Sequence, residues 1–253
     1  MLATTLTGAA TDRPPLVIAH GLFGSGRNLG VIAKRLSDER LVLTVDMRNH
    51  GDSDFLPSHS YADLAADLAE VIAAHGGRAD VMGHSMGGKA AMLLALSHPD
   101  LVHRLVVADI APVAYGHSQT HLIQAMRHVD LSRVDTRRDA DDQLRPLVAE
   151  DGVRAFLLQS LDVKGQRWRL NHDVLEAYMD QTTGWPADVT GQFSGPVLML
   201  SGAESDYVQP DHRAVIKGYF PKARFAKITG AGHWLHADKP RAFEAAIRAF
   251  LNA

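Results

Sequence analysis

The sequence has no cysteine, no block of like charges and no apolar run of membrane-spanning length. Without cysteine it can form no disulfide, no cysteine nucleophile and no thiolate metal site. A formal net charge of −3 without a charged block gives no electrostatic reason to expect nucleic acid or an anionic membrane as a partner. The first residues lack the basic segment and apolar core of a secretory signal. We therefore expect a soluble, cytoplasmic protein.

The 253 residues are enough for one large domain, or for one domain with an insertion. Hydrophobic residues make up 46% of the chain, which favours a sizeable core over global disorder. Apolar and amphipathic stretches alternate, which predicts an α/β fold with a mostly parallel, doubly wound sheet buried on both faces. The expected strands are 15–21, 40–48, 79–83, 101–112, 196–202 and 223–230, and the expected helices are 28–39, 61–77, the stretch after Ser85, 211–220 and 239–252.

This alternation stops between residues 113 and 190. The segment carries helical stretches such as "SQTHLIQAMRHV" and "VRAFLLQSL", and no convincing strand interrupts them. We interpret it as a helical cap inserted before the last two strands, not as an independent domain. The predicted α/β core is then formed by residues 1–112 and 191–253.

The glycine-rich stretch "ADVMGHSMGGKAAM" fits two motifs with different chemistry. Gly83, Gly88 and Lys89 match most of a phosphate-binding loop, but Ala90 stands where a hydroxyl would bind Mg²⁺. Gly83 and Ser85 instead begin a complete G-x-S-x-G, the nucleophile elbow, in which a sharp turn joins a strand to a helix. The apolar run before the serine and the helix formers after it favour the elbow.

An elbow serine needs two backbone N–H groups to stabilise the oxyanion of a tetrahedral intermediate. The turn "HGLFGSG" follows the first confident strand, and ligands bind at the carboxyl ends of such strands. We predict that the N–H of Leu22, with Phe23 as the second choice, forms the oxyanion hole together with Met86.

His233 is the predicted general base, although the chain holds 14 histidines. Its position selects it, because the loop "GAGHWLHADKP" follows the last strand, and a neutral imidazole can accept the serine proton. His236 forms H-x-x-H with it, but no glutamate follows as in H-E-x-x-H, so we expect no metal site. His84 is expected to line the pocket and His20 to bond within its own loop.

The residues leave the third member of the triad open. Asp206 and Asp109 both follow strands and both lie between the serine and His233 in the chain. Either carboxylate could orient the imidazole, and either could be an ordinary turn residue. Glu204 is a weaker candidate. The carboxylates of 46–53 precede the serine, and we assign that loop to packing and turn structure.

Together these segments resemble the α/β-hydrolases over nearly the whole chain, and more narrowly the small esterases of the YbfF type and their mitochondrial abhydrolase relatives. The motifs that carry the resemblance are "HGLFGSGRNLG", "DMRNHGDS", "GHSMGGKAAM", "DIAPV" and "GAGHWLHADKP". It implies hydrolysis of esters or thioesters without a cofactor. In that branch the acid is the aspartate of "DIAPV", here Asp109, whereas many other hydrolases of the fold have it near Asp206. The segment before Pro15 has room for one short strand where larger members have two.

The resulting hypothesis is a serine esterase or thioesterase that acts on a small-molecule substrate with short-to-medium acyl chains. The side chains expected around an apolar acyl pocket are Phe23, His84, Met86, Phe156, Trp185 and Trp234. Two alternatives remain. The same triad could hydrolyse carbon–carbon bonds, open lactones or perhydrolyse acids, or the chain could be a non-catalytic receptor with a hydrolase fold.

Overall fold

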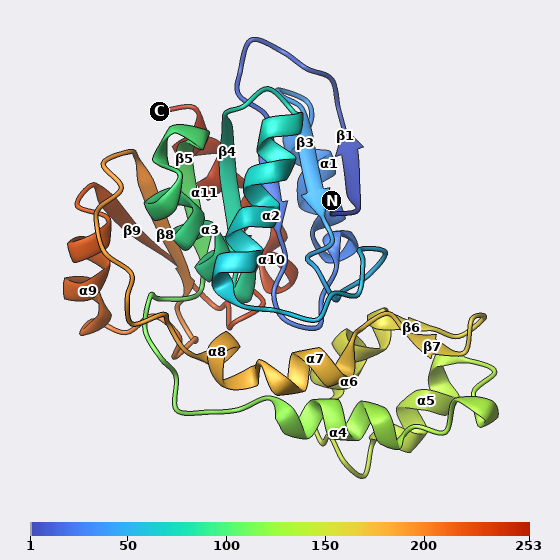
Figure 1. Ribbon diagram of the computed structural model, residues 1–253. Helices are drawn as coiled ribbons and strands as arrows, with labels where there is room; N and C mark the ends of the chain where they lie inside the picture. Colours follow the sequence, from blue (N-terminus) through green and yellow to red (C-terminus); the bar gives the residue numbers. More distant parts are fainter. Residues whose placement is uncertain (1) are drawn as a thin grey trace.

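The computed structural model describes residues 2–253 and contains a central seven-stranded sheet (Figure 1). The strand order is β1-β3-β2-β4-β5-β8-β9, and every neighbouring pair is parallel except β1 and β3. The predicted mostly parallel α/β fold is confirmed. The strands are β1 (Thr4–Thr7), β2 (Leu16–Ala19), β3 (Val42–Val45), β4 (Ala79–His84), β5 (Val102–Ala108), β8 (Val197–Gly202) and β9 (Ala223–Ile228).

Alternate residues of the central strands pack against different helices. Val17 faces one hydrophobic cluster and Ile18 the other, as expected for a strand buried on both sides. Helices α2, α3 and α9 cover one face of the sheet, and α1, α10 and α11 cover the other. Their bounds are α1 (Gly30–Leu36), α2 (Tyr61–Ala74), α3 (Met86–Ser97), α9 (His212–Tyr219), α10 (Leu235–Asp238) and α11 (Pro240–Leu251).

Between β5 and β8 the chain forms a helical layer beyond one end of the sheet (Figure 1). Its helices are α4 (Thr120–His128), α5 (Arg137–Leu144), α6 (Asp151–Leu157), α7 (His172–Ala177) and α8 (Met179–Thr183). They share a hydrophobic cluster of their own, which also includes Phe23 from the core. The expectation of no strand here was wrong, because β6 (Leu161–Asp162) pairs with β7 (Arg167–Trp168) in a short antiparallel ribbon.

Short 3₁₀ turns complete the described structure at Gly26–Leu29, Pro99–Leu101, Leu131–Arg133 and Leu158–Ser160. No helix in the described part of the chain combines the length and the apolar character that crossing a bilayer requires.

Candidate active site

Ser85 forms the tight turn between β4 and α3. Its φ of 52° and ψ of −119° lie outside the regions that side chains favour. A Cβ at Gly83 would collide with the Gly87 carbonyl, and one at Gly87 would lie 2.5 Å from the His20 carbonyl oxygen. Both glycines are therefore required for this close packing of strand, turn and helix. The local structure is a nucleophile elbow and not a phosphate-binding loop.

The structure joins His233 to Asp109, across 124 residues of chain. His233 Nδ1 lies 2.7 Å from Asp109 Oδ2, and the aspartate is fully buried. The Gly202 N–H donates to Asp109 Oδ1 at 3.0 Å, and the Ser205 hydroxyl donates to Oδ2. A carboxylate held in this way keeps a proton on Nδ1 of the imidazole and leaves Nε2 as the basic nitrogen.

The alternative acids lie elsewhere. Asp206 is exposed, and its Oδ1 contacts only the side-chain amide of Gln209, at 3.4 Å, among the described residues. Glu204 is also exposed. Both residues follow β8 in the chain, whereas Asp109 directly follows β5 and its side chain is buried.

Two aromatic neighbours hold the His233 loop. Tyr207 stacks on the imidazole at a centroid distance of 3.9 Å and an interplanar angle of 20°. His84 Nε2 lies 2.8 Å from the His233 carbonyl oxygen, and burial lowers the pKa of His84 well below its usual value. Ser85 and His233 line one cavity but share no hydrogen bond within residues 2–253. That contact is commonly long in enzymes without substrate.

The predicted oxyanion donors lie on the wall of this cavity. Leu22 and Met86 both line it, and neither N–H has a protein acceptor within residues 2–253. The second choice, Phe23, differs, because its N–H donates to His50 Nε2 at 3.2 Å. His50 was not predicted to be near the site, because it stands in the loop 46–53 that we assigned to packing and turn structure.

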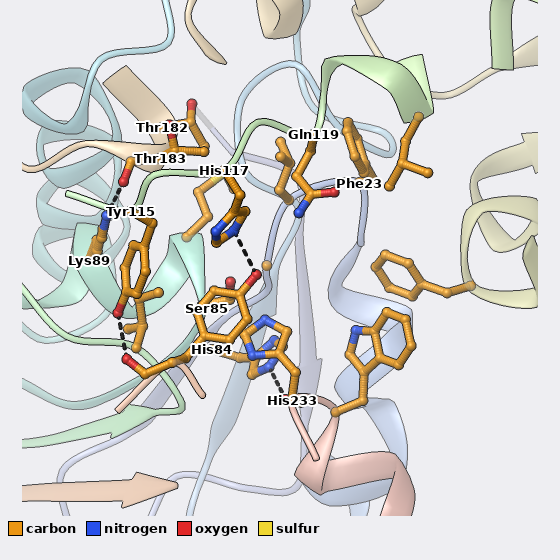
Figure 2. A pocket seen from close by; sticks show the side chains of 18 of the residues that line it. Phe23, His84, Ser85, Lys89, Tyr115, His117, Gln119, Thr182, Thr183 and His233 are labelled. Atoms are coloured by element: carbon orange, nitrogen blue, oxygen red, sulfur yellow. Dashed lines mark hydrogen bonds between the residues drawn. The ribbon is translucent and has the colours of Figure 1, made fainter. Parts of the chain in front are cut away.

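The cavity has a volume of about 280 Å³ and two chemically different sides (Figure 2). Figure 2 shows Phe23 on one side of Ser85, and Lys89 and Thr183 on the other. The apolar side is formed by Leu22, Phe23, Leu122, Val153, Phe156 and Trp234. The polar side chains of the lining are those of Tyr61, Lys89, Tyr115, His117, Gln119, Thr182, Thr183 and Tyr207. Most of the labelled ones lie on the Lys89 side of Ser85, whereas Gln119 lies beside Phe23 (Figure 2).

Trp185 is a correction to the predicted pocket. It does not line the cavity, whereas the other predicted lining residues do. It follows α8 where the chain returns to the sheet, and it packs between Tyr61 and Tyr219 at centroid distances of 6.4 and 5.9 Å. An aromatic residue in a segment of unknown path could not be assigned to core or pocket from its sequence position.

Lys89 also lines the cavity, although the sequence pattern assigned it no role in the site beyond the rejected phosphate-binding loop. Its side chain is buried, and Nζ donates to the carbonyls of Thr183, at 2.9 Å, and Gly184. Nζ also lies 4.8 Å from the centre of the Tyr115 ring. Burial lowers the pKa of Lys89 to about 7.

His236, the partner in the H-x-x-H pattern, is half-buried beside His84, with ring centroids 4.8 Å apart. Burial lowers its pKa to about 4. Within the described residues, no three histidine, cysteine, aspartate or glutamate side chains are grouped as they would be around a metal ion.

Known proteins that are similar to this chain include several that are hydrolases by name. Residues 14–240 match the family described as "alpha/beta hydrolase fold". The mouse protein named sn-1-specific diacylglycerol lipase ABHD11 is 44% identical over 257 residues, covering 97% of this chain and 83% of its own. Esterase YbfF of Escherichia coli K12 is 42% identical over 244 residues, covering 95% and 94%. The solved structure titled "Marine microorganism esterase" is 36% identical, with a TM-score of 0.93 and 98% coverage of each chain.

Proposed function

The chain belongs to the alpha/beta hydrolase family, and from this premise we propose that it cleaves carboxylic esters or thioesters of short-to-medium acyl chains through an acyl-enzyme intermediate. The observation that carries the proposal is the buried Asp109–His233 pair beside the strained Ser85 at one cavity. The names of the similar proteins, an esterase and a lipase, agree with it.

In the proposed reaction, the Ser85 oxygen attacks the acyl carbonyl carbon while His233 Nε2 accepts the serine proton. A serine hydroxyl is a weak nucleophile near neutral pH, so it depends on this base. His233 then protonates the leaving alcohol or thiol, which leaves the acyl group on Ser85. Water, activated by the same imidazole, releases the acid. Asp109 stabilises the imidazolium at both stages without itself taking the proton.

The N–H groups of Leu22 and Met86 are the proposed oxyanion hole. Both come from turns that follow the neighbouring strands β2 and β4, and neither N–H donates to a protein acceptor in the described part of the chain. Preorganised donors of this kind stabilise charge that develops only in the transition state, and losing one costs about 10²–10³ in rate. They are therefore expected to act on kcat more than on KM.

The apolar side of the cavity is the proposed site of the acyl chain, and its size supports the limit on chain length. A volume of about 280 Å³ is small for a ligand site, and the ring pair of Phe156 and Trp234, 5.2 Å apart, stands at its wall. The polar side then takes the oxygen- or sulfur-bearing leaving group.

The test is hydrolysis of p-nitrophenyl esters from acetate to octanoate, of the matching acyl-CoA thioesters and of a medium-chain diacylglycerol. Wild type is expected to turn over at least one series, and Ser85→Ala to fall to background. Ser97→Ala is the matched control, because Ser97 is an exposed serine at the far end of the same helix. Folded wild type that is inert on all three series would contradict the proposal.

A further inference from the structure

Two buried histidines, one in the loop after β2 and one in the loop after β3, each accept a hydrogen bond from the backbone of the other loop. The Phe23 N–H donates to His50 Nε2 at 3.2 Å, and the Met47 N–H donates to His20 Nε2 at 2.9 Å. Each loop therefore supplies one imidazole and one backbone donor. The two rings pack edge to face with centroids 5.1 Å apart. We call this arrangement of His20, His50, Phe23 and Met47 the imidazole clasp.

The hydrogen bonds determine the protonation of both rings. His20 Nδ1 lies 2.8 Å from the Gly21 carbonyl oxygen, and His50 Nδ1 lies 2.9 Å from the Arg48 carbonyl oxygen. A carbonyl can only accept, so each Nδ1 carries the hydrogen, and each Nε2 presents a lone pair to an N–H. Both rings are thus neutral. Burial agrees, since it lowers the pKa of His50 to about 3 and that of His20 to about 4.

Phe23 is held from both sides. Its N–H is bound by His50, and its carbonyl accepts a hydrogen bond from the Ser160 hydroxyl of the cap at 2.6 Å. Its φ of 64° lies in the left-handed region, which costs a non-glycine residue energy and requires support from its surroundings. The peptide that precedes it carries Leu22, whose own N–H has no acceptor within residues 2–253.

We propose that His50 and Ser160 are positioning residues for the oxyanion hole. By holding the N–H and the carbonyl of Phe23, they keep the strained turn from rotating and keep the Leu22 N–H free for the substrate. This inference rests on the proposed hydrolytic function. The Leu22 N–H is needed where negative charge develops. Its misplacement therefore reduces stabilisation of the transition state more than it reduces binding of the substrate.

Two substitutions at His50 separate its hydrogen bonds. In His50→Gln the amide oxygen reaches the place of Nε2 and can accept from Phe23. In His50→Asn the shorter amide reaches only the place of Nδ1 and can donate to the Arg48 carbonyl. The proposal expects His50→Asn to lower kcat about 10²-fold with KM nearly unchanged, and His50→Gln to retain kcat to within about tenfold. A merely structural role for the ring gives no reason for this ranking.

Ser160→Ala supplies a second variant that leaves the buried rings untouched. It releases the carbonyl side of Phe23, and the loss of one hydrogen bond is expected to lower kcat about tenfold, again at constant KM. Thermal unfolding midpoints of all three variants are measured beside the kinetics. If His50→Asn does not fold, Ser160→Ala still decides the proposal, and unchanged kcat in that variant overturns it.

These measurements distinguish failure of the proposed hydrolytic function from failure of the positioning role alone. Wild type that hydrolyses no ester or thioester, and whose Ser85 reacts with no fluorophosphonate, overturns the proposed function and the positioning role with it. Active wild type with an equally active, folded His50→Asn overturns the positioning role alone. Active wild type with a low kcat in His50→Asn and a retained kcat in His50→Gln supports both.

Discussion

The core and the cap contribute to the cavity in different ways. Ser85, Asp109 and His233 come from the core, each in a turn that follows a strand of the sheet. The cap contributes wall side chains from helices that pack mainly on one another, such as Phe156 and Thr183. The ends of strands in one sheet hold the three side chains in fixed positions. Residues of the separate helical layer can change without moving these three side chains. We therefore expect substitutions in the core to change the rate of the reaction, and substitutions in the cap to change which acyl chains are accepted.

The largest expected effect follows from removing the charge of Asp109. Asp109→Asn keeps the shape but no longer holds the required tautomer of His233, so kcat/KM should fall about 10⁴-fold. Asp206→Asn is the matched control and should stay close to wild type, because Asp206 is exposed and has no hydrogen bond with His233 in the structure of residues 2–253. Steady-state kinetics on the preferred ester measures both. A larger loss in Asp206→Asn would move the acid to that loop.

The next effect tests whether the cap sets selectivity. Phe156→Ala removes one ring of the pair with Trp234 at the apolar side of the cavity. The loss of buried apolar contact should lower kcat/KM for octanoate about tenfold and leave acetate nearly unchanged. Leu147→Ala, at a cap residue that is 46% exposed, is the control. Equal losses for both esters would mean that this side does not bind the acyl chain.

Lys89 connects the two regions, because it extends from α3 of the core to the end of α8 in the cap. Backbone carbonyls and the rings of Tyr61 and Tyr115 face its ammonium. His117 lines the same cavity, and its pKa is lowered by burial and, to a smaller extent, by the positive charges of His233 and Lys89. Burial lowers its pKa from 10.5 to about 7. Between these values the unfolded chain holds a proton that the folded chain lacks, so the free energy of unfolding rises with pH.

Lys89→Met removes this contribution while keeping a similar volume. The Tm of wild type relative to Lys89→Met should therefore increase between pH 7 and pH 10. Thermal melts of both proteins across that range measure the difference, in which the other titrating groups largely cancel. A difference in Tm that does not change with pH would show that the ammonium keeps its proton in the folded state.

The smallest effect is expected at Trp185. It packs outside the cavity, and its indole N–H is buried without a partner within residues 2–253. Trp185→Phe should leave the chain-length profile unchanged and alter the free energy of unfolding by less than about 1 kcal/mol, since no hydrogen bond is lost. Ester kinetics and urea unfolding test this. An altered chain-length profile would return Trp185 to the substrate pocket.

Much of the core could be predicted because its patterns are local. Apolar runs of strand length, a helix cap at Ser60 and helix formers after Ser85 all act between near neighbours in the chain. The contact at Ser60 is of this kind, because its side chain accepts the N–H of Asp63, three residues on. The cap was harder to predict. Its short ribbon, β6 and β7, has only two residues in each strand and no distinct periodicity.

The site likewise contains residues that a local pattern predicts and one residue that it does not. G-x-S-x-G and the positions after strands were enough to select Ser85 and His233, since parallel strands bring their carboxyl ends to one edge. The acid was different. Asp109 and Asp206 satisfied the same chain order, and a family resemblance chose between them. The contact of 2.7 Å with His233, and the exposure of Asp206, depend on strand order and loop direction.

The sequence by itself therefore determined the α/β class, the order of the elements and the strained turn at Ser85, because each follows from interactions over a few residues. Tertiary structure alone decided that Asp109 meets His233, that Trp185 packs in the core and that His50 holds Phe23. Asp109 and His233 are 124 positions apart in the chain, and so are Tyr61 and Trp185. Phe23 and His50 are 27 positions apart. No local pattern encodes such separations, because they depend on how strands and helices pack in three dimensions.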